Sequence, residues 1–132
     1  MKAIIVGASL ILIGSVQAQT TKEAYDLQER CGRRATDVWI KEYNNKSIHD
    51  NYVTRYHNHY SLRFNKCFFL EINNGLGDFV GKKLFRLFDI NEDVYYGSYI
   101  EGFGPLDMCE MEERECQTEE EWRALIKPFM ED

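Results

Sequence analysis

Apolar residues recur at helical spacing in the first part of the chain. From Ala24 to Val38, five apolar residues follow one another at intervals of three or four, the period that places side chains on one face of an α-helix. Thr20 and Glu23 precede this run with the spacing of a capping box, in which both side chains bond free backbone N–H groups of the first turn. The pattern predicts a long amphipathic helix over residues 21–43.

Beyond residue 51 the aromatic content rises and the period of the pattern shortens. Tyr52, Tyr56 and Tyr60 share one parity, as on one face of a strand, although their spacing of four also fits a helix. Residues 67–72 are better strand material, and the Asn-Asn-Gly sequence at 73–75 after them is a turn signal.

The second half of the chain predicts a hairpin and a short helix. The apolar runs 84–90 and 94–100 are separated by three polar residues, which indicates a hairpin. Thr118 and Glu121 form a second capping box before an apolar stripe that we expect to end near Pro128. This order predicts an α+β domain, in which the long N-terminal helix packs on one face of a three- or four-stranded antiparallel sheet.

The first eighteen residues have the pattern of an export signal. Lys2 precedes an apolar run over 3–13, and the small-x-small sequence at 16–18 is typical of a cleavage site. A membrane anchor is the alternative, but the run is shorter than the roughly 20 residues that a spanning helix needs. We expect removal of residues 1–18 and a single exported domain, residues 19–132, without a stable membrane anchor.

Export gives the four cysteines a structural meaning, because an even number in an oxidising compartment usually forms disulfides. Three pairings exist for Cys31, Cys67, Cys109 and Cys116. Cys109 and Cys116 bracket a short acidic loop that closes easily, which leaves Cys31 to join the long helix to a strand through Cys67. A zinc site is the alternative, but the C-x-x-C spacing typical of such sites is absent.

Acidic residues are concentrated near the C-terminus. The formal net charge of the whole chain is −6. Residues 101–132 alone carry eleven acidic and three basic side chains. So acidic a chain is a poor candidate for nucleic-acid binding, which needs a basic surface. A cationic exported protein is a better partner, and we expect it to contact the loop residues Glu110, Glu112, Glu113 and Glu115, although such charge runs often serve only solubility.

Four blocks of the mature sequence resemble a group of small exported bacterial proteins without an assigned function. The resemblance rests on a Cys-Gly-x-Arg-Ala block and on three longer blocks, at residues 31–35, 59–68, 87–97 and 119–132. It implies a bacterial source and therefore a periplasmic or extracellular location. It brings no catalytic residue, because none is assigned in that group.

Two classes of function fit these observations. The first is a non-enzymatic protein-binding module of the inhibitor or immunity type, for which small size, disulfides, acidity and aromatic residues are suited. The second is a small hydrolase or metal-binding protein that uses His57 and His59, which share one face if their segment is a strand. The ligand set of a metal site is incomplete in sequence, so we predict no metal, no cofactor and no catalytic residue, and favour the binding module.

Overall fold

The computed structural model describes residues 16–132, and side chains from residue 21 onward. Two α-helices, seven strands and two short 3-10 helices follow one another along this part of the chain. Their bounds are α1 (Val16–Tyr43), β1 (Ile48–His49), β2 (Tyr52–Ser61), β3 (Lys66–Gly75), η1 (Gly77–Phe79), β4 (Lys83–Asp89), β5 (Val94–Glu101), η2 (Gly104–Leu106), β6 (Met108–Met111), β7 (Arg114–Glu115) and α2 (Glu119–Met130).

All seven strands form one antiparallel sheet in the order β1-β2-β3-β4-β5-β6-β7. The prediction of a three- or four-stranded sheet is therefore wrong. The additional strands are β1 and β7, each two residues long, and β6. These segments are too short to show a period of two, and β6 overlaps the region that the sequence predicts to be an acidic loop. Such short edge strands offer few free backbone groups to another sheet.

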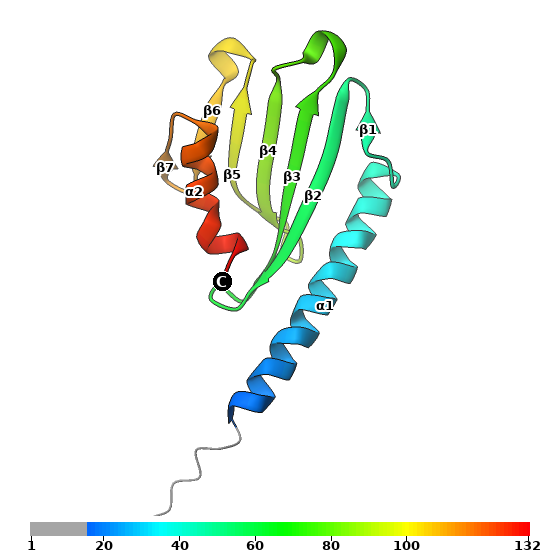
Figure 1. The fold of residues 1–132 in the computed structure, drawn as a ribbon, viewed down its shortest axis with the longest axis vertical. Helices are drawn as coiled ribbons and strands as arrows, with labels where there is room; N and C mark the ends of the chain where they lie inside the picture. The colour runs from blue at the N-terminus through cyan, green and yellow to red at the C-terminus, as the bar shows by residue number, and fades with distance from the viewer. Residues whose placement is uncertain (1–15) are drawn as a thin grey trace, which may run out of the picture.

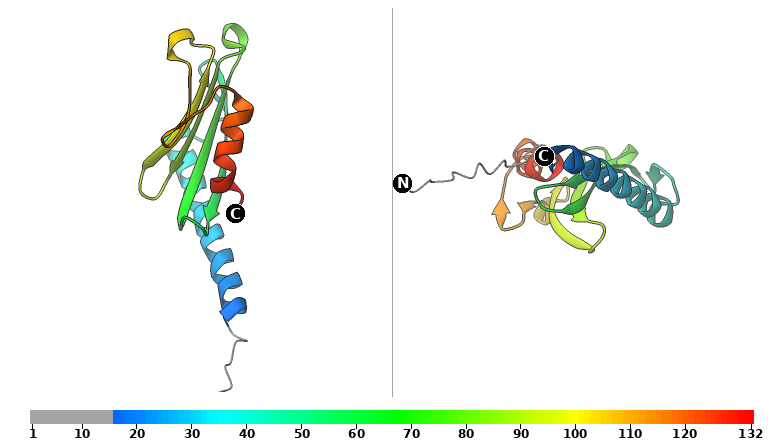
Figure 2. Two further views of the ribbon diagram at one scale, coloured as in Figure 1. Left: turned by 90° about the vertical axis from the view of Figure 1, so that its left-hand side faces the viewer. Right: turned by 90° about the horizontal axis from the view of Figure 1, so that it is seen from below.

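The two helices pack on opposite faces of the sheet (Figures 1 and 2). Strand β3 is covered on both sides, because its successive side chains point to opposite faces. Phe68 and its even-numbered neighbours lie in a core with Trp122 of α2. Cys67 and Phe69 lie in a second core with Ala35 of α1. The continuous apolar run of β3 is thus explained by burial between two helical layers.

Of the two predicted capping boxes, the one at Thr118 is confirmed, and the one at Thr20 is wrong because Thr20 lies inside α1. Helix α1 ends at Tyr43 as predicted, but it begins at Val16 rather than at residue 21. At α2, the Thr118 hydroxyl accepts a hydrogen bond from the Glu121 backbone N–H at 3.1 Å. Pro128 lies inside the last turn, so α2 ends two residues later than expected.

Two further expectations concern the chain between and before these elements. The segment containing Tyr56 is a strand, β2, and the helical alternative is excluded. Residues 73–75 continue β3 instead of forming a turn, which begins only after Gly75. The predicted signal, residues 1–18, lies outside the described residues apart from its last three, so its removal stays a prediction.

Candidate functional site

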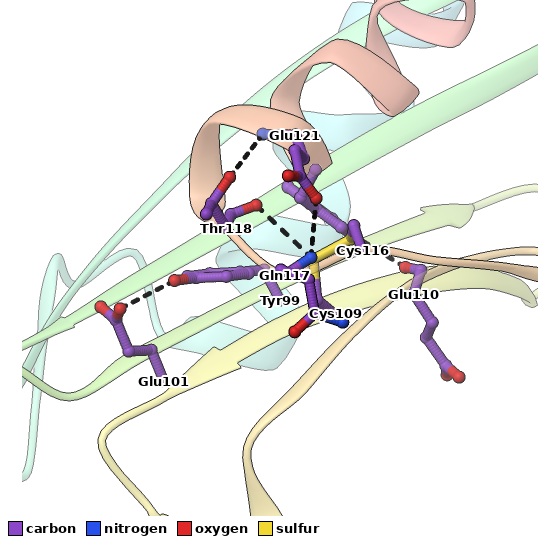
Figure 3. Close-up of a disulfide and its surroundings, with 9 residues drawn as sticks. Tyr99, Glu101, Cys109, Glu110, Cys116, Gln117, Thr118 and Glu121 are labelled. Atoms are coloured by element: carbon purple, nitrogen blue, oxygen red, sulfur yellow. Dashed lines mark hydrogen bonds between the residues drawn. A yellow bond between two sulfur atoms is a disulfide. The ribbon is translucent and has the colours of Figure 1, made fainter.

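Both predicted disulfides are present, and all four cysteines are used. Cys31 of α1 bonds Cys67 of β3 and so links a helix to the centre of the sheet. Cys109 of β6 bonds Cys116, which follows β7 (Figure 3). Two disulfides indicate an oxidising, exported environment.

The acidic loop of the sequence is a hairpin made by β6 and β7. Glu110 and Glu115 lie directly opposite each other in this strand pair, an arrangement in which like charges repel. Glu112 and Glu113 form the exposed turn, where Glu112 has a positive φ of 55°. The hairpin therefore brings two of the four predicted partner-binding residues face to face and exposes the other two at its end.

A hollow of about 430 Å³ lies beside the Cys109–Cys116 disulfide, and all of the charged residues that line it are acidic. Besides Glu110 and Glu115 it is lined by Glu101 and Asp107. The Tyr99 hydroxyl donates to Glu101 at 2.9 Å (Figure 3). Burial, followed by this hydrogen bond, raises the pKa of Tyr99 to about 12. This edge of the sheet is thus acidic, and the neutral Tyr99 side chain lines the hollow beside the carboxylates.

His57 and His59 share one face of β2, as the strand pattern predicted. They line a groove of about 610 Å³ between β2 and α2, whose α2 wall includes Arg123 and Lys127. Of the two histidines, His57 is exposed. The His59 Nε2 atom lies 2.5 Å from an oxygen of Asp132, so its ring is held by the residue that follows α2.

Asp132 is bound by three groups, two at the end of β2 and one in the connection from β2 to β3. One oxygen faces His59, and the other accepts hydrogen bonds from the Ser61 hydroxyl at 2.6 Å and the Arg63 backbone N–H at 2.8 Å. Desolvation raises the pKa of Asp132, but these bonds together lower it to about 2. Ser61 is fully buried and donates to Asp132 rather than to the imidazole. The His-Asp-Ser set therefore fastens the end of α2 and lacks the serine–histidine bond of a nucleophilic triad.

Two features of the described residues bear on the alternatives. Among residues 16–132, no group of three or more His, Cys, Asp and Glu side chains has an arrangement that could hold a metal ion. In the same part of the chain, no helix has both the length and the apolarity needed to cross a bilayer.

Sequence reasoning missed a pair of neighbouring loops at one end of the sheet (Figure 1). We call residues 76–82, between β3 and β4, and residues 102–107, between β5 and β6, the paired loops. The Lys82 ammonium group lies 4.4 Å from the ring centre of Phe79 in its own loop and 5.0 Å from that of Phe103 in the other. Cation–π contacts of this kind hold the two loops together.

The backbone of the paired loops is closely packed. Gly102 has a φ of 91°, and a Cβ atom there would lie 2.8 Å from the Gly81 carbonyl oxygen. Within the first loop, the Gly75 N–H donates to the Lys82 carbonyl at 2.8 Å. In the second, the Asp107 side chain accepts a hydrogen bond from the Phe103 N–H at 2.6 Å. The loops therefore have a defined conformation.

These loops expose the two most accessible large apolar residues among the described side chains. Val80 is 74% exposed and Leu106 is 72% exposed, one on each loop. Their sequence signal is an aliphatic residue close to glycines: Val80 lies between Gly77 and Gly81, and Leu106 follows Gly102 and Gly104. That signal predicts a loop, and only the meeting of the two loops in space turns it into a surface.

No family model, no curated protein and no solved structure matches this chain. The resemblance to small exported bacterial proteins therefore stays a prediction.

Proposed function

We propose that the protein is an exported, disulfide-stabilised, non-enzymatic binding module of the inhibitor type, which inserts its paired loops into a concave apolar site of a protein partner. The observation that carries this proposal is the exposure of Val80 and Leu106 on braced neighbouring loops. The two side chains lie on loops that contact each other, and we infer that they belong to one apolar surface of the kind that marks interaction sites.

The rigidity of the paired loops supports a binding role on energetic grounds. Association costs free energy whenever loops become ordered in the complex, and a loop that is already ordered avoids this cost. The contacts of Lys82 with two rings and the close approach of Gly102 to Gly81 supply this order before binding. A protruding, preorganised surface fits a cleft better than it fits a flat partner.

The charge next to the paired loops defines the partner further. Asp107 belongs to one loop and also lines the acidic hollow with Glu101, Glu110 and Glu115. A cationic exported protein, with basic residues around an apolar cleft, would complement both surfaces. A periplasmic or extracellular location and a bacterial source, as the sequence resemblance implies, fit this proposal.

The alternative of a hydrolase or metal-binding protein has less support. His59 is held by Asp132, and Ser61 is buried. His57 remains as the accessible histidine of the groove. A single imidazole without a neighbouring nucleophile offers acid–base chemistry but no complete reaction.

The test is capture of the partner with matched variants. Val80→Asp combined with Leu106→Asp changes the paired loops. Val94→Asp combined with Leu62→Asp changes the same residue types at the opposite end of the sheet, where both are also exposed. Oxidised wild-type protein and the control should capture the same partner from the exported proteins of the source organism.

The loop variant should lose at least 90% of this capture while keeping the circular dichroism spectrum and melting temperature of the wild type. Equal capture by the loop variant and the control would exclude the paired loops as the binding surface. If Glu112→Gln, Glu113→Gln and Glu115→Gln together abolished capture instead, the acidic hairpin would be the primary surface.

A further inference from the structure

A groove of about 520 Å³ lies on the α1 side of the sheet, away from the acidic hollow and the α2 groove. One wall is a stripe of α1 in which Arg34, Val38 and Glu42 follow one another at intervals of four. The opposite side is formed by β3, β4 and β5. Helix α1 contacts mainly β2 and β3, so it leaves β4 and β5 open. The volume lies within the range of small-molecule sites.

The floor of this groove contains a carboxylate, Glu71, that is only 3% exposed. Arg86 on the neighbouring strand donates to Glu71 from Nε at 3.1 Å and from Nη2 at 2.8 Å. The Asn73 side-chain amide also donates to Glu71 at 2.6 Å, and the Tyr43 hydroxyl donates to its other oxygen. Both oxygens of the buried carboxylate therefore accept hydrogen bonds, from donors on α1, β3 and β4.

This network fixes the guanidinium group of Arg86 at the groove. A two-point contact with a buried carboxylate restricts both its position and its plane. The Arg86 side chain is nevertheless 52% exposed, so part of it remains accessible from solvent. Two apolar residues at positions 71 and 86 would allow the same strand pairing without the free-energy cost of burying a charge, so the sheet itself does not require this ion pair. Arg86 is thus an anchored cation that faces an open groove.

An aromatic wall is fixed in the same way. The Tyr95 hydroxyl lies 2.6 Å from the Ser98 hydroxyl and donates to Glu110 at 2.9 Å. Half of Tyr95 remains exposed, and Phe88 and Ile90 line the groove beside it. These side chains offer an apolar surface next to the anchored cation.

The remaining charged residues of the groove have both signs. Arg34 adds a second guanidinium group, while Glu42 and Asp93 contribute two carboxylates. A simple anion would be repelled by these carboxylates, and a simple cation by the arginines. A ligand with both charges meets complementary groups at each of its ends.

We propose that this groove binds a zwitterion with an apolar side chain, namely an α-amino acid or a short peptide. Its carboxylate contacts the guanidinium of Arg86, its ammonium group contacts Glu42 or Asp93, and its side chain packs on Phe88, Ile90 and Tyr95. This binding site is separate from the paired loops and does not depend on them.

The test is a nuclear magnetic resonance titration of the oxidised 15N-labelled protein with L-phenylalanine and with the dipeptide Leu-Phe. Saturable shifts should occur in the amides of residues 86–95 and 38–43. Phenylalaninamide, which lacks the carboxylate, and N-acetylphenylalanine, which lacks the ammonium group, should each bind about tenfold more weakly, because each loses one charge-assisted contact. Tighter binding of the dipeptide identifies peptides as the ligand, and tighter binding of phenylalanine identifies free amino acids.

Variants assign each contact without removing the buried network. Arg86→Lys keeps a positive charge beside Glu71 but loses the two-point geometry of the guanidinium, so it should reduce the difference between phenylalanine and its amide. Glu42→Gln with Asp93→Asn should abolish the difference between phenylalanine and its acetyl derivative. Glu23→Gln with Glu29→Gln, on the same helix outside the groove, should change neither. The proposal is overturned if neither phenylalanine nor Leu-Phe causes saturable shifts at about 10 mM, or if the blocked derivatives bind equally well.

Discussion

Two carboxylates show how single residues set the stability of this protein. Asp132 fastens the end of α2 to the β2–β3 connection, and Glu71 holds Arg86 at the centre of the sheet. Each accepts several hydrogen bonds, so neutralising either one leaves donors without a charged acceptor. Loss of one hydrogen-bonding partner of a buried group typically costs about 1–3 kcal/mol.

The pKa of Asp132 predicts a pH-dependent contribution to stability. Its pKa falls from the ordinary value of 3.8 to about 2 in the folded protein. The unfolded chain therefore binds the proton more readily, so the contribution is complete above pH 3.8 and disappears as the pH falls through about 2. Asp132→Asn should lower the melting temperature at pH 7, and this difference should shrink as the pH falls from 4 to 2.

Thermal melts of both proteins between pH 7 and pH 2 test this expectation. The control is Glu131→Gln, which removes an exposed carboxylate that lies 3.7 Å from Lys127. A gap between Asp132→Asn and wild type that stays constant down to pH 2 would show that ionisation of Asp132 is not the cause.

Glu71→Gln tests the buried network. The substitution keeps the size of the side chain but removes the charge that Arg86 and Tyr43 contact, so we expect a loss of about 2–4 kcal/mol in the free energy of unfolding. The measurement is urea denaturation, with a lower midpoint and an unchanged slope. In a double-mutant cycle, Arg86→Gln should cost much less in the Glu71→Gln background than in the wild type, and additive effects would contradict the coupling.

At the scale of elements, the two disulfides should contribute unequally. Cys31 and Cys67 are separated by 36 residues, whereas Cys109 and Cys116 are separated by 7. The loop-entropy relation gives about 4 kcal/mol for the first and about 2 kcal/mol for the second. The double variants Cys31→Ala/Cys67→Ala and Cys109→Ala/Cys116→Ala leave no free thiol behind, and their calorimetric melting temperatures should follow this order. Equal losses would contradict it.

The paired loops predict a contrast between two glycines of one segment. Gly102 and Gly104 both have positive φ, at 91° and 64°. An added Cβ meets the other loop only at Gly102. Gly104→Ala should therefore cost about 1–2 kcal/mol through backbone strain, whereas Gly102→Ala should cost more and also separate the loops. Urea denaturation and the amide shifts of residues 79–82 distinguish the two, since only Gly102→Ala should move those shifts.

The elements that could be predicted from sequence are the long periodic ones. The capping box of Thr118 and Glu121 predicts where helix α2 begins, and the apolar run of residues 67–72 predicts β3. Strand β6 could not be predicted, because four residues with a charged Glu110 among them have no measurable period. It becomes a strand because its backbone pairs with β5, which is a tertiary effect.

The candidate surfaces show the same limit. The shared face of His57 and His59 followed from strand alternation alone. The exposure of Val80 and the anchoring of Arg86 did not, because each depends on residues that are distant in sequence. The first depends on the contact of Lys82 with Phe103 of the other loop. The second depends on the pairing of Arg86 with Glu71 on the adjacent strand. Pairings of this kind are properties of the sheet register rather than of any local pattern.

For the whole molecule, the asymmetric charge predicts the kinetics of partner binding. Glu112, Glu113 and Glu115 are exposed on a hairpin closed by a disulfide. If the partner is cationic, replacing all three with Gln should slow association about tenfold at low ionic strength and flatten its dependence on salt, with little change in dissociation. Stopped-flow or surface plasmon resonance at several salt concentrations measures this. An unchanged association rate at low salt would show that the hairpin does not steer the association with the partner.

The Cys31–Cys67 bond also determines what happens when the backbone is cut. Residues 44–47, which connect α1 to the sheet, are all exposed, as is typical of sites of proteolytic nicking. Cleavage there would separate the helical segment from the rest of the chain in sequence, yet the two pieces would remain covalently joined through the central strand. A nicked molecule would migrate intact on a non-reducing gel and divide only after reduction, so an exported protein of this design tolerates one protease cut without losing α1.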